Sequence, residues 1–267
     1  MKASYPIGIF DSGIGGLAIA HAIQEVLPHE NMIYFGDTAH LPYGDKSPSA
    51  IQSYALKIVD FLLEQQCKLI VIACYSATSV ASQLVKDHVN NKAIVLDVVD
   101  PMVHHLHMHY SNQRIGLIGT RLTVNSNIYK KKLNGILDLQ CLPTHLLASA
   151  IEEFHDHPVI DSLLQEYLSR PALQEINALL LACTHYPLVK KNIQRYYTTH
   201  GKKTEVIDPA PIIAHAVKEC LEKTSLLNTT PAPKKHFYLS DYTESFALNA
   251  KTFFSDSITI EHYPLWD

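Results

Sequence analysis

Short and mostly uninterrupted apolar runs alternate along the chain with longer segments in which apolar positions recur at helical spacing. Unbroken apolar runs are typical of parallel strands that helices cover on both faces. The runs close at glycine, aspartate, cysteine or proline, where a strand gives way to a turn. They predict strands at 7–10, 32–35, 69–73, 94–98, 114–118, 139–142, 179–182, 205–207 and 237–239. The pattern therefore predicts an α/β fold with mainly parallel sheets flanked by helices.

The segment between the second and third predicted strands has the clearest helical pattern. Ser47 is a suitable N-cap, and Pro48 suits the first helical turn. A single apolar face follows, made of Ile51, Tyr54, Ala55, Ile58, Phe61 and Leu62. An amphipathic helix is predicted here.

Two parts of the chain resemble each other. The strand and glycine turn at 6–13 look like those at 114–120, and the strand that ends at Cys74 looks like the strand that ends at Cys183. We interpret this as two similar lobes, with a boundary near 97–101 and a loop or linker at 225–235. Ligands of open parallel sheets bind beyond the carboxyl ends of the strands, which is where the polar motifs of both halves lie.

Length and composition narrow the class of protein. A chain of 267 residues, 47% hydrophobic and 18% charged with a formal charge of −4, suits one large or two small globular domains and not a disordered protein. The sequence has no cluster of Lys and Arg that would bind phosphates, so no nucleic-acid partner is expected. The longest strongly apolar stretches, 69–73 and 178–182, are far shorter than the roughly 20 residues that span a bilayer. No signal-peptide core precedes the first strand, so no membrane partner and a cytoplasmic location are expected.

Two of the five cysteines stand in matching contexts. An odd number of cysteines without close pairing argues against a disulfide framework. Cys74 and Cys183 each end an apolar strand and are followed by hydroxyl-bearing residues. A single cysteine in such a place is most often an inert core residue, but two in matching places favour thiols that transfer protons, with Asp11 and His185 as candidate assistants. Cys67, Cys141 and Cys220 lack such neighbours and are interpreted as structural.

The glycine turn after the first strand has three interpretations. Gly13, Gly15 and Ala18 fit the pattern G-x-G-x-x-A, and Asp37 ends the second strand at about the ribose-binding distance, so a dinucleotide site is one alternative. Exposed amides at a helix N-terminus favour any phosphate or carboxylate, which is the second. A turn needed only for packing is the third.

A histidine-rich tract at 104–109 suggests a metal site at first sight. No acidic residue or cysteine partner accompanies the tract. Apart from His185, the two strand-end cysteines have no Cys or His at metal-binding spacing, and no remaining cluster completes four ligands. We therefore predict a helix with a solvent-facing side at 104–109, and no metal site.

Taken together, these motifs resemble the glutamate racemase family. The matching segments cover nearly the whole chain and occur in the family's order. They are 7–17, 34–44, 72–74, 118–120 with Thr123, 150–153, 182–188 and the tail 237–241 followed by a helix.

The resemblance implies two α/β lobes facing each other across a cleft that holds the active site. The first lobe would comprise 1–97 plus 208–267 and the second 98–207. The family interconverts L- and D-glutamate without a cofactor and supplies D-glutamate for peptidoglycan; glutamate is thus the implied partner, and a homodimer is a candidate assembly.

The resemblance also implies roles for individual residues. Cys74 and Cys183 would be the acid/base thiols, assisted by Asp11 and His185 respectively, with Glu152 as a further acidic member of the site. The residues that would bind the amino acid are Asp11, Ser12, Pro42, Tyr43, Gly44, Tyr75, Ser76, Thr120, Thr123, Thr184 and His185.

One departure from the family pattern bears on the substrate. After the first cysteine the family usually has Asn-Thr, whereas this chain has Tyr75-Ser76. Serine keeps the hydroxyl, but a phenol cannot replace the donor and acceptor of an amide. The alternatives are therefore a related racemase for another amino acid such as aspartate, or a paralogue with impaired catalysis and a binding role.

Overall fold

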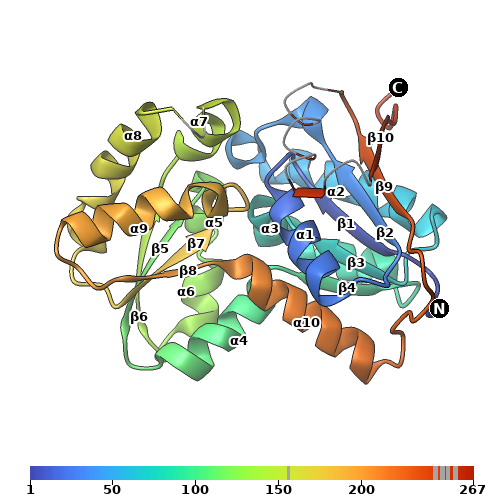
Figure 1. The fold of residues 1–267 in the computed structure, drawn as a ribbon, viewed down its shortest axis with the longest axis horizontal. Helices are drawn as coiled ribbons and strands as arrows, with labels where there is room; N and C mark the ends of the chain where they lie inside the picture. The colour runs from blue at the N-terminus through green and yellow to red at the C-terminus, as the bar shows by residue number, and fades with distance from the viewer. Residues whose placement is uncertain (155–156, 243–245, 247–249, 251–252, 255–257) are drawn as a thin grey trace.

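The strands of the described residues form two parallel sheets, each flanked by helices (Figure 1). The computed structural model describes residues 1–267 except 155–156, 243–245, 247–249, 251–252 and 255–257. The first sheet has the order β10-β9-β2-β1-β3-β4 and the second the order β6-β5-β7-β8. The strands are β1 (Ile7–Asp11), β2 (Met32–Gly36), β3 (Leu69–Ile72), β4 (Ile94–Asp97), β5 (Arg114–Gly119), β6 (Asp138–Pro143), β7 (Ala178–Ala182), β8 (Glu205–Ile207), β9 (Lys235–Leu239) and β10 (Thr259–His262).

Helices cover both faces of each sheet. They are α1 (Gly16–Val26), α2 (Pro48–Glu64), α3 (Tyr75–Val89), α4 (Val99–Tyr110), α5 (Arg121–Asn125), α6 (Ile128–Leu133), α7 (Leu147–Phe154), α8 (Val159–Leu168), α9 (Lys190–Thr199) and α10 (Pro209–Lys223), with short 3-10 turns at Thr38–His40, Tyr43–Asp45, Pro171–Leu173 and Tyr186–Val189. Helices α2 and α3 pack against each other beside the first sheet, and α8 packs against α7 and α9 beside the second.

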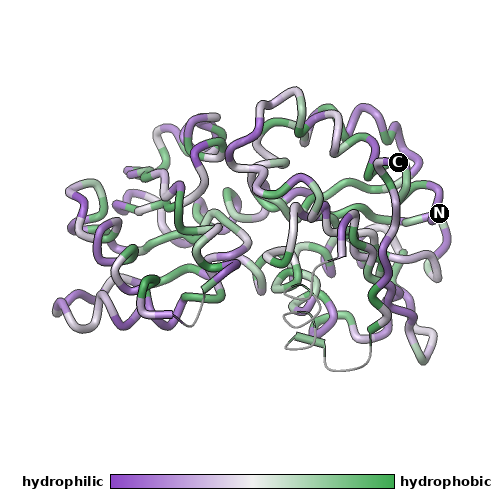
Figure 2. Tube along the Cα trace, turned by 90° about the horizontal axis from the view of Figure 1, so that it is seen from above, coloured by the Kyte–Doolittle hydropathy of each residue, from purple (hydrophilic) through white to green (hydrophobic). Residues whose placement is uncertain are grey.

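One apolar core extends through both lobes. It contains Ile9 and Val71 of the first sheet, Leu117 and Leu180 of the second, and side chains of α1, α4 and α10. Figure 2 shows hydrophobic residues concentrated along strands inside the lobes. Because α10 packs on both α1 and α4, the two lobes are joined by buried apolar surface as well as by the chain (Figure 1).

The predicted elements are largely confirmed. All nine predicted strands are present, with ends that differ from the prediction by at most two residues. Ser47 accepts a hydrogen bond from the Ala50 N–H at 3.3 Å and caps α2, and the predicted apolar face of α2 is buried except for the half-buried Tyr54. The segment 225–234 contains no helix or strand. The helix predicted after Asp241 falls mostly on residues outside the described part of the chain.

The predicted lobe boundaries stay a prediction. The strands of the first sheet come from residues 7–97 and 235–262, and those of the second from residues 114–207. Helices α4 and α10 contact each other where the chain passes between the sheets.

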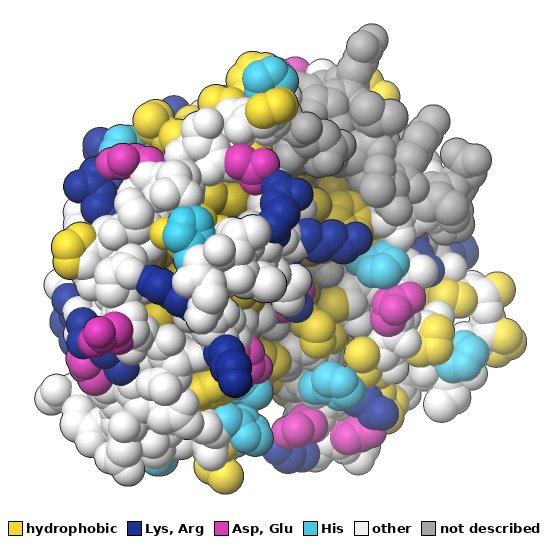
Figure 3. Space-filling view, turned by 60° about the vertical axis from the view of Figure 1, so that its left-hand side comes forward, with side chains coloured by type: hydrophobic (Ala, Val, Ile, Leu, Met, Phe, Trp, Pro, Cys, Tyr) yellow, Lys and Arg dark blue, Asp and Glu magenta, His cyan; other side chains and the backbone are white. Residues whose placement is uncertain are grey.

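The surface carries charged side chains of both signs (Figure 3). On the face drawn in Figure 3, cationic, acidic and histidine side chains are interspersed. Within the part of the chain that the structure describes, no helix is both long and apolar enough to cross a membrane.

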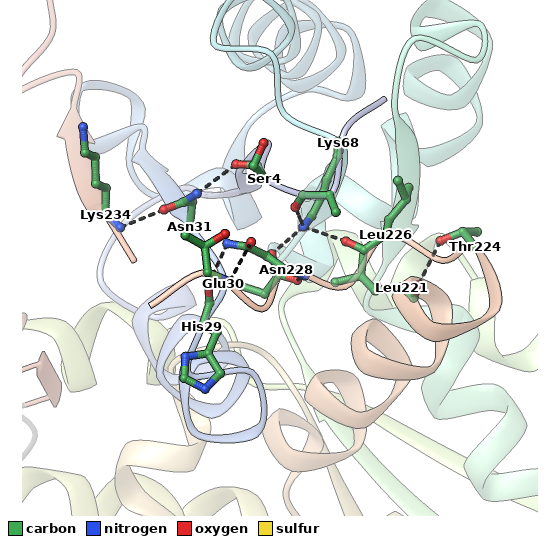
Figure 4. Close-up of polar contacts among 12 residues, drawn as sticks. Ser4, His29, Glu30, Asn31, Lys68, Leu221, Thr224, Leu226, Asn228 and Lys234 are labelled. Carbon is green, nitrogen blue, oxygen red and sulfur yellow. Dashed lines mark hydrogen bonds and ion pairs between the residues drawn. The ribbon is translucent and has the colours of Figure 1, made fainter. Parts of the chain in front are cut away.

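A buried ion pair lies in the first lobe, next to the start of β3. Lys68 and Glu30 are almost fully buried, with the Lys68 Nζ at 2.5 Å from Glu30 Oε2 (Figure 4). The Lys68 ammonium also donates to the carbonyl of Leu226 at 2.9 Å, and Glu30 Oε1 accepts from the Asn228 N–H at 2.8 Å. The segment that leads from α10 to β9 is thereby attached to the start of β3.

Candidate active site

The residues predicted to be functional converge where strands of the two sheets end. Asp11 is the last residue of β1, and Cys74 follows β3 and forms the N-cap of α3. On the second sheet, Thr120 follows β5 and caps α5, and Cys183 follows β7. Both cysteines border one narrow cavity between the lobes, which has a volume of about 30 Å³. The cavity is lined by Ser12, Leu41, Pro42, Tyr43, Gly44, Asp45, Cys74, Tyr75, Ser76, Thr120, Arg121, His145, Ala148, Ser149, Glu152, Cys183, Thr184 and His185.

Cys74 lies at the positive end of a helix. Its Sγ accepts a hydrogen bond from the Ala77 N–H at 3.5 Å in the first turn of α3, where the helix dipole favours negative charge. Burial nevertheless raises the pKa of the Cys74 thiol well above its ordinary value, and the nearby Asp11 carboxylate raises it further. Cys74 is therefore a protonated thiol at neutral pH, a form that can donate a proton.

Cys183 has a different set of neighbours. Its Sγ lies 3.8 Å from Nδ1 of His185, and Nε2 of the same ring lies 3.3 Å from Glu152 Oε2, at ion-pair distance. Burial lowers the pKa of His185, but the contacts with Cys183 and Glu152 outweigh burial and raise it well above its ordinary value. An imidazole with a raised pKa thus lies between the Cys183 sulfur and an acidic side chain.

Asp11 joins the first lobe to the second. Its Oδ2 accepts hydrogen bonds from the N–H groups of Gly16 at 2.8 Å and Gly13 at 3.3 Å, and the Thr184 hydroxyl lies 3.5 Å from both carboxylate oxygens. Burial raises the pKa of Asp11, while the charge of His185 opposes that rise. The carboxyl group is fully buried behind the cavity wall and touches both lobes.

The glycine turn is explained by this carboxylate and not by a dinucleotide. Two amides that would face a pyrophosphate at the start of α1 are bonded to Asp11. A Cβ on Gly15 would lie 2.4 Å from the Thr184 Oγ1 and 2.8 Å from the His185 Nδ1, so glycine permits the second lobe to approach. Asp37 is engaged by other side chains, including a 2.6 Å hydrogen bond from the Tyr43 hydroxyl, and is not free for a ribose. The dinucleotide interpretation is therefore wrong.

Hydroxyl groups cross the cleft on its other side. The Ser76 Oγ of α3 lies 2.9 Å from the Thr120 Oγ1 of the second lobe, which in turn lies 3.0 Å from the Thr123 Oγ1. The pair Ser76 and Thr120 borders the cavity, so both lobes present hydroxyls to the same space. Such groups can hydrogen-bond the carboxylate or ammonium group of an amino acid.

Comparison with known proteins identifies the family. The model for Asp/Glu/hydantoin racemases matches residues 17–217. The chain belongs to this racemase family. A glutamate racemase of Syntrophus aciditrophicus is 39% identical over 263 residues, which cover 95% of this chain and 94% of that protein. One of Neisseria meningitidis serogroup C is 39% identical over 248 residues, 90% of this chain and 89% of that one.

Solved structures of racemases have the same fold. The glutamate racemase of Francisella tularensis, solved in complex with D-glutamate, matches with a TM-score of 0.89 and 35% identity over 99% of both chains. The glutamate racemase of Thermus thermophilus, in complex with beta-chloro-D-alanine, matches with a TM-score of 0.84 and 31% identity over 98% of both. The resemblance and the two-lobed α/β fold predicted from the sequence are confirmed.

The racemase fold places most of the predicted substrate-binding residues at the cavity. Those that line it are Ser12, Pro42, Tyr43, Gly44, Tyr75, Ser76, Thr120, Thr184 and His185. Asp11 and Thr123 are buried behind the wall and contact lining residues. Arg121 and His145 also border the cavity and were not predicted, although both follow closely on the ends of strands β5 and β6, a position that could have indicated them.

Tyr75 belongs to the cavity wall and to the core at once. Its side chain is 2% exposed and packs in the apolar core shared by the lobes, with its hydroxyl next to that of Tyr129. Burial raises the pKa of Tyr75 well above its ordinary value, and the charges of Tyr129 and Cys183 add to the rise. The phenol is thus a packed element of this racemase and not a mobile group at the mouth of the cleft.

The remaining cysteines and the histidine tract lie away from the cavity. Burial raises the pKa of Cys67 to about 12 and that of Cys141 to about 11, as expected for unreactive thiols. The tract 104–109 lies on α4, where His104, His107 and His109 are exposed as predicted. Among the described residues no three His, Cys, Asp or Glu side chains are grouped so that they could hold a metal ion.

Proposed function

We propose that this protein is a glutamate racemase that interconverts L- and D-glutamate and supplies the D-enantiomer for peptidoglycan. The observation that carries the proposal is the pair Cys74 and Cys183, which comes from equivalent strand ends of two lobes and borders one cavity. The chain also belongs to a family in which relatives 35–39% identical to it are named glutamate racemases. Inversion at a carbon atom needs proton transfer on both faces, and two thiols from two lobes meet that need.

The reaction proceeds by two proton transfers. One cysteine, as thiolate, removes the α-proton and becomes a thiol, leaving a carbanion whose electron pair spreads into the carboxylate. The other cysteine, as thiol, gives its proton to the opposite face and becomes a thiolate. The two sulfurs have then exchanged protonation states, and the reverse reaction starts from that state.

The neighbours of each sulfur support different starting states. A protonated His185 stabilises negative charge on Cys183, and Glu152 orients the imidazole ring. Cys74 is protonated because of burial and the Asp11 carboxylate, and Asp11 assists when this thiol loses its proton. These neighbours support a reaction in which Cys74 starts as the acid and His185 stabilises the thiolate that forms on Cys183.

The developing enediolate is stabilised by groups that need not move during the reaction. The hydroxyls of Ser12, Ser76, Thr120 and Thr184 border the cavity, and the N-terminus of α3 directs its dipole there. Fixed donors in a narrow cleft stabilise developing charge more than water does, because they are already oriented.

Exchange of the α-proton with solvent tests the proposal. Enzyme free of added cofactor is incubated in D2O with single enantiomers of glutamate, aspartate and alanine, and deuterium at Cα and optical rotation are followed. We expect both glutamate enantiomers to gain deuterium and to racemise. Exchange confined to aspartate would support a related racemase, and no exchange with any amino acid would support an impaired paralogue.

Tyr75 lines the cavity but packs in the apolar core shared by the lobes, which does not favour the alternatives of a racemase for another amino acid or an impaired paralogue. A cytoplasmic location, independence from cofactors and metals, the lack of a nucleic-acid partner and a homodimeric assembly stay predictions.

A further inference from the structure

A buried carboxylate behind the cavity connects it to the C-terminal residues. Asp37 follows β2 and is fully buried. Its Oδ2 accepts a hydrogen bond from the Tyr43 hydroxyl at 2.6 Å, and its Oδ1 accepts from the Ser240 hydroxyl at 2.7 Å and from the indole Nε1–H of Trp266 at 2.8 Å. The His40 Nδ1 lies 3.0 Å from both oxygens. The neighbouring segment thus holds Oδ2 through Tyr43, and the C-terminal residues Ser240 and Trp266 hold Oδ1.

The indole of Trp266 contacts aromatic and cationic neighbours. Its ring meets His40 edge to face at a centroid distance of 4.5 Å and Tyr54 at 5.3 Å. His40 and Tyr54 stack on each other at 3.9 Å, and the Lys57 Nζ lies 5.0 Å from the centre of the indole ring. These contacts orient the indole N–H toward Asp37.

The other side of the same carboxylate reaches the cleft. The residues 41–45 line the cavity, and Tyr43 in their middle is 1% exposed with its hydroxyl on Asp37. A Cβ added to Gly44 would lie 2.9 Å from the Thr120 Cβ of the other lobe, so there is little room for this segment to move toward the cleft. A change in the position of Asp37 therefore changes the wall that faces Thr120.

We propose that Trp266 is a positioning residue for the substrate cleft. Its indole N–H and the Ser240 hydroxyl fix the Asp37 carboxylate, which holds Tyr43 and with it the 41–45 wall against the second lobe. The inference rests on the proposed function and extends it, because it assigns the C-terminal residues a part in binding glutamate. The C-terminal segment then does more than add an edge strand to the first sheet.

Substitution of Trp266 separates positioning from folding. Trp266→Phe keeps an aromatic ring on His40 and Tyr54 but removes the N–H donor. We expect the KM for both glutamate enantiomers to rise roughly tenfold, equivalent to about 1.4 kcal/mol, with kcat within about twofold of wild type. Ser240→Ala should shift KM in the same direction. Tyr263→Phe is the matched control, since Tyr263 packs in the same C-terminal segment on Phe35 and Phe61 without touching Asp37.

The intact protein offers a second measurement, because Trp266 is the single tryptophan of the sequence. Addition of D-glutamate should change the tryptophan emission in a saturable way, with a midpoint near the KM, and lysine at the same concentration should not. Tyr43→Phe removes the link between Asp37 and the wall and should abolish the change, whereas Tyr263→Phe should retain it.

The outcomes distinguish this inference from the proposed function. A wild type that racemises glutamate, combined with an unchanged KM in folded Trp266→Phe and a tryptophan emission that does not respond to D-glutamate, overturns the positioning role alone. A wild type without turnover of glutamate overturns the proposed function and this inference with it. Raised KM in Trp266→Phe with normal kcat and a normal melting temperature supports the inference.

Discussion

Replacing Lys68 with methionine should strongly destabilise the protein without changing its chemistry. The Lys68 ammonium is fully buried and donates to the carbonyl oxygens of Ala3 and Leu226 as well as to Glu30. Methionine fills a similar volume but removes the charge and all three donors. Glu30, which is 2% exposed, then keeps only the Asn228 N–H as a described donor (Figure 4).

The size of the expected stability loss follows from the Glu30 carboxylate, which stays buried without its cationic partner. Removing one partner of a buried ion pair costs about 3–5 kcal/mol, because the other charge stays buried. At about 2–4 °C per kcal/mol for a chain of this size, the melting temperature should fall by about 6–20 °C. The double variant Glu30→Gln/Lys68→Met removes both charges and should recover at least about 2 kcal/mol of that loss.

Urea denaturation with linear extrapolation measures these differences. An exposed ion pair between Glu166 of α8 and Arg170, just after the helix, provides a matched control. Arg170→Met should lower the free energy of unfolding by no more than about 1 kcal/mol. The ion pair lies outside the set of residues that line the cavity, so kcat and KM at 25 °C should equal those of wild type. A Lys68→Met protein within about 1 kcal/mol of wild type, or a double variant as unstable as the single one, would refute the reasoning.

The other predictions concern the site. Cys74→Ala and Cys183→Ala should each lower racemisation by at least roughly 10²–10⁴-fold, as measured by polarimetry, and an active variant would remove that thiol from the mechanism. Asp11→Asn and His185→Asn should lower kcat unequally in the L-to-D and D-to-L directions, and equal losses would contradict separate roles. The raised pKa of His185 adds stability that is fully present below the ordinary value of about 6.5 and is lost as pH rises through the folded value. The stability difference between wild type and His185→Asn should therefore shrink in urea titrations toward alkaline pH. Tyr75→Phe keeps the packed ring and should change stability by no more than about 1.5 kcal/mol and leave activity unchanged, while Tyr75→Asn should lose about 3 kcal/mol of stability and gain no glutamate turnover. A gain in turnover would show that the phenol obstructs the substrate.

The strands could be predicted because burial on both faces leaves a mark in the sequence. A parallel strand such as β3 or β7 has apolar residues at every position, since both of its faces are covered. The strand β10 was missed because it lies at the edge of the first sheet and is mostly exposed, with threonine, glutamate and histidine among its four residues. No apolar run marks such an edge.

The cleft could be predicted for a topological reason. Carboxyl ends of parallel strands meet at one edge, so Cys74 and Cys183 could be assigned to the site from their strand-end contexts. The role of Asp37 could not, because its spacing from the glycine turn suggested a ribose ligand. Its partners Ser240 and Trp266 are 203 and 229 residues away along the chain, and no local pattern connects them. Contacts of that range follow from the strand order, in which β9 pairs with β2.

The two lobes are similar in outline but surround their cysteines differently, and that difference has a consequence for the reaction. L- and D-glutamate have equal free energies in solution, so kcat/KM must be equal in the two directions for wild type and for any variant. The unequal neighbours, Asp11 near Cys74 and the His185–Glu152 pair beside Cys183, can therefore appear only in kcat, KM and isotope effects. Under the proposed function, each enantiomer is bound productively by one of the two protonation states of the free enzyme. Burial and the charge of Asp11 raise the pKa of Cys74 and so disfavour the state in which that thiol has lost its proton, from which turnover of one enantiomer must begin.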